Sequence, residues 1–169
     1  MAPTPDVDAF DALYAAEWGR VVAALVMVGS DRRTAEEIAQ ETFIRAWARW
    51  DRVVVLDRPA GWLYTTAFRL LRRRYRRLDH RTAGQPTDEA RHGAWAPGDD
   101  VTIVDRIAIT EAIGRLPVRQ RQAVVARHVL GLSTTEAAEA LGVSPEALRQ
   151  LLHRGVTAMR TTLEPERPR

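Results

Sequence analysis

The sequence predicts an all-α protein of two small helical domains joined by a linker. Apolar residues recur at the three- and four-residue spacing of helices, and no alternating strand pattern stands out. Residues 79–101 interrupt this periodicity with glycine, proline and acidic residues, over a length that is unusual inside a compact domain. Two capped helix starts follow close together, at Ser133 and Ser144. A chain of 169 residues is long enough for two small domains.

The first domain, residues 1–78, is expected to contain three to four helices, of which three long ones can be placed. The first spans about Asp8 to Val28, and the second spans about 34–50. Between them and the third helix, the run from Val53 to Leu56 is interpreted as a buried loop. Pro59, at the first helical position, begins the third helix, which runs to about residue 78. The expected core face of the second helix is Ala35, Ile38, Ala39, Thr42, Phe43, Ala46, Trp47 and Trp50.

An acidic linker that we expect to be flexible, residues 79–102, leads to the second domain, residues 103–169. Helices are predicted there at about 103–115, 118–130, 134–141 and 145–163. Ser133 and Glu136 form a capping box, Gly142 permits a left-handed turn, and Ser144 precedes a helical proline. This spacing is typical of a helix-turn-helix that places its second helix in a DNA groove. The alternative is an αα-hairpin inside an ordinary helical bundle.

The composition excludes several classes of protein. There is no cysteine, so disulfides and thiolate metal sites are ruled out, and the four histidines are dispersed without ligand spacing. No nucleophile–base pair, phosphate-binding glycine loop or paired carboxylate pocket stands out. We therefore expect no catalytic residues, no metal, no cofactor and no enzyme activity. The first residues lack signal-peptide features and the longest apolar run is short, so we expect a cytoplasmic protein without membrane insertion.

Charge is segregated along the chain, and the third helix is its most basic part. Residues 58–81 carry eight arginines and one aspartate, a net charge of +7, whereas residues 1–57 and 82–105 each carry −4. Arginines at three- and four-residue spacing predict a positive stripe suited to phosphates, and the aromatic residues near it can stack on unpaired bases. The alternative is a solvated basic face with the aromatic rings in the core. The stripe consists of Arg69, Arg72, Arg73, Arg76 and Arg77, and the aromatic residues are Trp62, Tyr64 and Phe68.

Two further surfaces are candidates for binding. Glu36, Glu37, Gln40 and Glu41 form an acidic face that suits a basic partner protein, or that only complements the helix dipole. On the second helix of the helix-turn-helix, Arg149 and Gln150 suit base edges, whereas His153 and Arg154 suit phosphates. His153 is equally compatible with a neutral surface position. The polar residues expected to face away from the core there are Ser144, Glu146, Arg149, Gln150, His153 and Arg154.

Four motifs occur in the order seen in extracytoplasmic-function (ECF) sigma factors, which this chain resembles over about residues 8–163. They are AEEIAQETFIRAW (35–47), RPAGWLY (58–64), LPVRQRQAV (116–124) and the helix-turn-helix at 132–154. The resemblance implies a non-catalytic bacterial transcription initiation factor with a sigma region 2 domain and a sigma region 4 domain. Its implied partners are core RNA polymerase, through the clamp of the largest subunit and the flap, and promoter DNA. It also implies regulation by a separate anti-sigma factor or by expression level.

The resemblance also assigns roles to residues. The acidic face would bind polymerase, the loop at about 51–61 and the arginine helix would capture and melt the −10 element, and residues 144–154 would bind the −35 element. The implied −10 contacts are Arg58, Trp62, Thr65, Arg69, Arg72, Arg73, Arg76 and Arg77. Arg69 stands where the family often has asparagine, and Gln150 and Leu151 replace the more typical serine and arginine.

The alternative function is a stand-alone helix-turn-helix regulator that binds operators without polymerase. A repressor has no need of Glu37, Gln40 and Glu41, so the acidic helix favours a sigma factor over a repressor. A helical adaptor that contacts only proteins would leave the arginine stripe without a role.

Overall fold

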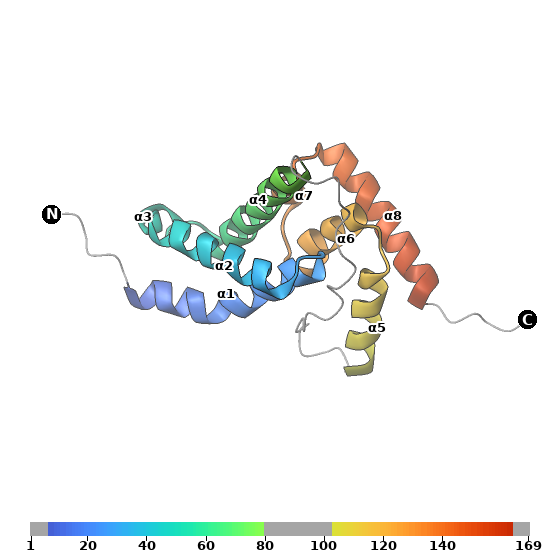
Figure 1. Ribbon diagram of the computed structural model, residues 1–169, viewed down its shortest axis with the longest axis horizontal. Helices are drawn as coiled ribbons and strands as arrows, with labels where there is room; N and C mark the ends of the chain where they lie inside the picture. The colour runs from blue at the N-terminus through green and yellow to red at the C-terminus, as the bar shows by residue number, and fades with distance from the viewer. Residues whose placement is uncertain (1–6, 80–102, 164–169) are drawn as a thin grey trace, which may run out of the picture.

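The computed structural model describes residues 7–79 and 103–163, and every regular element in these ranges is a helix (Figure 1). The predicted linker, apart from its first residue, lies outside the described residues. The N-terminal unit contains α1 (Val7–Met27), α2 (Arg32–Trp47), α3 (Trp50–Val53) and α4 (Pro59–Asp79). The C-terminal unit contains α5 (Ile103–Gly114), α6 (Val118–Val124), the π-helical turn η1 (Val125–Val129), α7 (Thr134–Leu141) and α8 (Pro145–Leu163).

Local chemistry sets where α2 begins. Gly29 has a φ of 105°, a conformation that favours glycine, and it turns the chain at the end of α1. Asp31 is in an extended conformation, and its carboxylate accepts the Thr34 N–H at 2.9 Å as an N-cap. The pKa of Asp31 is lowered chiefly by this hydrogen bond to its charged form. These two residues fix the reversal between α1 and α2.

Aromatic side chains from α1, α2 and α3 pack together at one end of the N-terminal unit. The Phe10 ring lies edge-on to Trp50, with 5.2 Å between centroids, and to Trp47, at 4.9 Å. Trp47 is nevertheless 42% exposed, so its placement in the core face of the second helix was wrong. It occupies the last position of α2, where its ring packs edge-on against Phe10 while much of its surface stays in contact with solvent.

The segment after α3 also differs from the prediction. Val53 is buried at the end of α3, but Val54, Val55 and Leu56 are exposed, so the expected buried loop is wrong beyond its first residue. Within the short helix α3, Trp50 and Val53 are the buried residues. The next three residues connect it to α4, and such connections run over the surface. An exposed apolar loop therefore precedes the arginine-rich helix.

The helix-turn-helix forms as predicted. Ser133 and Glu136 make both hydrogen bonds of a capping box, at 3.2 Å and 2.7 Å. Gly142 follows α7 in the left-handed conformation, with φ 64°. The Ser144 hydroxyl accepts the Ala147 N–H at 3.1 Å at the start of α8. Leu141 and Leu148 are buried between the two helices. The helix predicted at 118–130 divides instead into α6 and η1, where Leu130 N–H donates to Val125 O.

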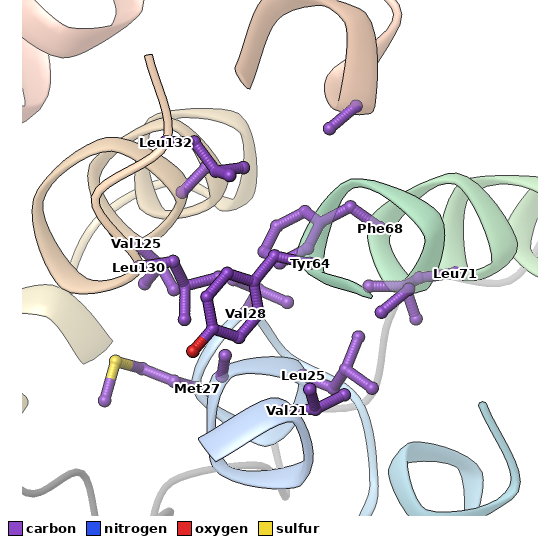
Figure 2. Packing of buried hydrophobic residues seen from close by; sticks show 14 of the residues in the cluster. Val21, Leu25, Met27, Val28, Tyr64, Phe68, Leu71, Val125, Leu130 and Leu132 are labelled. Carbon is purple, nitrogen blue, oxygen red and sulfur yellow. The ribbon is translucent and has the colours of Figure 1, made fainter. Parts of the chain in front are cut away.

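The two units share one hydrophobic core. Val125, Leu130 and Leu132 point toward Tyr64 of α4 and Val28 at the end of α1 (Figure 2). All five side chains are at most 5% exposed. Helices α4 and α7 also lie side by side (Figure 1). The described parts of the two units are therefore packed directly against each other.

Candidate nucleic-acid interface

Helix α8 presents all of its predicted DNA-binding residues to solvent. It packs inward through Leu148 and Gly155, which are buried. Arg149 is held by Glu146 at 3.1 Å, and both side chains are more than half exposed. The pKa of Glu146 is lowered by its own backbone N–H at the helix start and by Arg149. The six exposed residues are Ser144, Glu146, Arg149, Gln150, His153 and Arg154.

The predicted arginine stripe on α4 is divided between two neighbouring helices. Arg69 and Arg72 lie along the side of α4 that faces α7. Arg73 and Arg77, with Arg74, line a groove between α4 and α2. Arg76 is exposed. The sequence predicts one continuous solvent-facing surface, whereas the structure shows two contact regions with exposed guanidinium groups between them.

The side that faces α7 holds its arginines through oxygen acceptors. The Arg69 guanidinium forms an ion pair with Glu139. Arg72 Nη1 donates to the carbonyl oxygens of Glu139 and Ala140, each at 3.3 Å. Arg58, just before α4, donates from Nη1 to the Gly131 carbonyl at 2.9 Å. Burial, together with the neighbouring Arg76 and Arg69, lowers the pKa of Arg72.

The remaining predicted −10 residues are less accessible than the arginines. Thr65 is buried and Trp62 is half-buried on α4. Tyr64 and Phe68 are core residues, each 2% exposed, which agrees with the core alternative for the aromatic rings. The Tyr64 hydroxyl donates to Glu17 of α1, and burial raises the pKa of Tyr64 above its usual range.

The acidic face on α2 is covered by arginines of its own chain. Glu36 pairs with Arg32 at 2.8 Å, and Glu41 pairs with Arg45 at 2.7 Å. Glu37 contacts Arg33 at 3.2 Å and Arg74 of α4 at 2.7 Å, and hydrogen bonds from Arg74 and then Arg33 lower its pKa. Gln40 is exposed, as expected. The carboxylates of Glu36, Glu37 and Glu41 remain between two-fifths and one-half exposed.

The start of α2 bears on the helix-dipole alternative. The helix begins at Arg32, so its first turn contains no acidic residue and Glu36 and Glu37 lie in the second turn. The dipole effect fades beyond the first turn. The acidic residues therefore contribute little to stabilising the N-terminus of α2. Their partial exposure agrees better with a surface that binds a partner.

Two residues of these surfaces were missed at the sequence level, Arg74 and Glu139. Their partners, Glu37 and Arg69, are 37 and 70 residues away along the chain. Among residues 7–79 and 103–163, no group of three or more potential ligands could hold a metal ion. None of the helices in those ranges is long and apolar enough to cross a membrane.

An exposed recognition helix, joined to a basic helix in a second helical unit, defines a DNA-binding transcription factor. Residues 13–81 match Sigma-70 region 2, and residues 106–159 match Sigma-70, region 4. The chain is therefore a sigma factor built of these two regions.

Comparison with known sigma factors narrows the class. The chain is 31% identical over 143 residues to the ECF RNA polymerase sigma factor SigL of Mycobacterium tuberculosis, covering 83% of this chain and 80% of SigL. It is 31% identical over 156 residues to the RNA polymerase sigma factor CarQ of Myxococcus xanthus, covering 92% of this chain and 90% of CarQ. The chain belongs to the ECF RNA polymerase sigma factors.

Solved structures share the fold. The sigma factor RpoE of Bartonella quintana, crystallised in complex with the anti-sigma factor NepR, aligns with a TM-score of 0.65 at 20% identity. That alignment covers 94% of this chain and 98% of RpoE. CnrH, in complex with the cytosolic domain of CnrY, aligns with a TM-score of 0.56 at 21% identity, over 94% of this chain and 89% of CnrH.

Proposed function

We propose that this chain directs core RNA polymerase to promoters by reading a −35 element with α8 and a −10 element with α4. The observation that carries the proposal is the pairing of an exposed recognition helix with a basic helix in a chain of the ECF family. The stand-alone regulator is not favoured, because region 2 is present and its acidic helix has no use in operator binding.

The −35 element is read from α8 as duplex. A recognition helix contacts base edges in the major groove with residues near its N-terminus. Arg149 and Gln150 are in that part of α8, and they donate to base edges. His153 and Arg154 lie one turn further along and contact phosphates. Glu146 positions Arg149 through their ion pair until DNA replaces it.

The −10 element is captured by α4 and the loop before it. The arginines of α4 neutralise the phosphates of the separated strand. Val54, Val55 and Leu56 offer an exposed apolar surface next to Arg58, which suits a base that has left the stack. Trp62 and Thr65, the remaining residues assigned to the −10 element, lie in the first two turns of α4.

The acidic face of α2 binds the clamp of the largest polymerase subunit. Its carboxylates are partly exposed and already carry guanidinium partners, so basic side chains of the clamp replace Arg33, Arg45 and Arg74. Such exposed pairs are screened by solvent and contribute little to stability, so the exchange costs little. Region 4 would contact the polymerase flap, and both partners place the protein in the cytoplasm.

A dedicated anti-sigma factor is a further proposed partner. RpoE, which shares this fold, was solved in complex with the anti-sigma factor NepR. CnrH, which also shares it, was solved in complex with the cytosolic domain of CnrY.

The proposal is tested by in vitro transcription with bacterial core polymerase, this protein and a promoter library. We expect start sites that require both the polymerase and the protein, with two shared sequence blocks upstream of each start. Tight operator binding by the protein alone, with no polymerase-dependent start sites, would support the stand-alone regulator instead.

A charge-reversed variant tests the polymerase surface. Glu37→Arg with Glu41→Arg should weaken binding to core polymerase at least tenfold, because the clamp would then meet like charges. The helices should persist, since both carboxylates are exposed and their ion pairs contribute little to folding. Binding is measured by fluorescence anisotropy and helicity by circular dichroism.

The matched control is Asp11→Arg with Glu111→Arg. It makes the same change in net charge at two exposed residues of α1 and α5, away from the acidic face. It should bind core polymerase as the wild type does. If both double variants bind core polymerase with equal affinity, the acidic face of α2 is not the polymerase-binding surface.

A further inference from the structure

We propose that the free chain masks its own −10 surface, with α7 occupying the α4 arginines that promoter DNA would otherwise contact. The proposal rests on the function proposed above for α4. It assigns α7, the first helix of the helix-turn-helix, a second role as an intramolecular substitute for a nucleic-acid backbone.

The contacts fall on the predicted −10 residues. Three arginines assigned to promoter melting, Arg58, Arg69 and Arg72, each meet an oxygen atom of the C-terminal unit. A phosphate would offer them the same kind of acceptor. While the arginines hold these oxygens, they cannot neutralise a DNA strand.

The C-terminal end of α7 is suited to this substitution. The last carbonyl groups of a helix lack intrahelical partners and carry the negative end of its dipole. Arg72 donates to the carbonyl oxygens of Glu139, which also accepts the Gly142 N–H, and of Ala140. The Glu139 carboxylate adds a full negative charge for Arg69. The end of α7 therefore offers one carboxylate and two polar carbonyl oxygens to two neighbouring arginines, where DNA would offer phosphate oxygens.

Gly142 makes the approach of Arg72 to α7 possible. A Cβ at this position would collide with the Arg72 guanidinium. The same glycine adopts the left-handed conformation that ends α7. One residue thus both terminates the helix and clears the space into which the α4 side chain reaches.

Apolar packing holds the charged contacts in place. Leu132 is fully buried, and it lies between the Arg58–Gly131 contact and the start of α7. It points into the cluster that contains Tyr64 and Phe68 of α4 (Figure 2). Opening the two units would expose these side chains to water, so closure does not depend on the ion pair alone.

Masking is confined to one of the two DNA surfaces. The six polar residues of α8 remain exposed while α7 covers part of α4. The closed chain therefore has its −35 helix available and its −10 arginines occupied. A partner that separates the units, such as polymerase, would expose the second surface.

The closure is tested by energy transfer in the full chain, which contains no cysteine of its own. Asp57→Cys and Thr135→Cys place two dyes at exposed positions beside the junction of the two units. In this background, transfer should be high, and Glu139→Arg should lower it. The reciprocal exchange Arg69→Glu with Glu139→Arg should restore it, because the ion pair re-forms with reversed charges. Transfer that is insensitive to Glu139→Arg would overturn the proposal.

Masking is tested with unlabelled protein and a fluorescein-labelled, mixed-sequence single-stranded DNA of about 20 nucleotides. The control is Glu111→Arg, which makes the same charge change at an exposed residue of α5. If opening rises from about one-tenth to one-half of the molecules, apparent affinity rises about fivefold. We therefore expect Glu139→Arg to bind about fivefold more tightly than Glu111→Arg. Equal affinities would refute masking.

These measurements separate the two proposals. Energy transfer and binding of single-stranded DNA need neither polymerase nor a known promoter. If energy transfer and single-stranded DNA binding respond to Glu139→Arg as expected but no polymerase-dependent transcription is found, the proposed sigma function is refuted and the proposed closure is supported. If transcription depends on the polymerase and the protein but neither measurement responds to Glu139→Arg, the sigma function is supported and the closure is refuted.

Discussion

Arg149, which we propose reads a base edge, is held only weakly by Glu146 in the free protein. Their side chains are 62% and 72% exposed and 3.1 Å apart. An exposed, solvent-screened pair of this kind contributes little to stability, whereas a good bidentate contact to a guanine edge contributes about 1–3 kcal/mol of discrimination. The difference favours DNA, so the ion pair orients Arg149 without competing seriously for it.

We therefore predict that Arg149→Ala costs about 1–3 kcal/mol in binding at one position of the −35 element. Arg154→Ala, the control, should weaken binding to all sequences by similar amounts, because it removes a phosphate contact. Both are measured on promoters with single base-pair changes. A uniform loss for Arg149→Ala would reassign this residue to the phosphates.

Residues whose role depends on neighbours in sequence were predictable, and those with distant partners were not. Ser133, Gly142 and Ser144 act within four residues of themselves, so their pattern identifies the caps and the turn. Arg74 and Glu139 are ordinary charged residues until the fold brings Glu37 and Arg69 beside them. No periodicity in the sequence encodes such a pairing.

At the scale of elements, the packing of α8 on α6 depends on the absence of a side chain at Gly155. A Cβ there would lie 2.9 Å from Val124 Cγ2 and 3.5 Å from Gln120 Cβ. Val124 is buried and stiff, so it cannot swing away. Gly19 in α1 is the opposite case, since it is exposed and has no other atom within 4 Å of its added Cβ.

This contrast gives a prediction with its own control. Gly155→Ala should destabilise the protein by about 1–3 kcal/mol, because overpacking outweighs the better helix propensity of alanine. Gly19→Ala should instead stabilise it by about 0.5–1 kcal/mol, through propensity alone. Both free energies of unfolding come from urea titrations. Stabilisation by Gly155→Ala would show that α6 and α8 can separate at little cost.

The order and extent of the helices were largely predictable, because amphipathic periodicity and capping residues are local signals. The expected and observed bounds of α5, α7 and α8 differ by at most one residue. One exception is the second helix, predicted to end at about residue 50: α2 ends at Trp47, and a separate short helix, α3, begins at Trp50. The others are η1, where hydrogen bonds shift from the α to the π pattern, and Val54 to Leu56, which are apolar yet exposed. Composition alone does not distinguish an apolar loop that is exposed from one that is buried.

At the scale of the whole molecule, the two units form one hydrophobic core although they match two separate sigma regions. The sequence does not reveal this arrangement. The apolar periodicity of a helix is the same whether its apolar face packs within its own domain or against the other domain. The residues that join the units come from the end of α1, from α4 and from the segment Val125 to Leu132.

We predict that the chain unfolds in a single cooperative transition. Because neither unit keeps its full core without the other, calorimetric and van't Hoff enthalpies should agree. Leu132→Ala should cost about 2–5 kcal/mol, the range for a buried leucine, whereas Leu163→Ala, at an exposed helix end, should change stability by less than about 0.5 kcal/mol. Two resolved transitions in the wild type would show that the units fold independently.

The apolar nature of the junction between the units has a thermal consequence. Burial of apolar surface carries a heat-capacity change, and the hydrophobic contribution weakens as temperature falls. Separation of Leu132 and Leu130 from Tyr64 therefore becomes less unfavourable on cooling, even though no residue acts as a temperature sensor. In the proposed closure, the share of open molecules therefore rises on cooling, and the −10 arginines become more available to promoter DNA at low growth temperature.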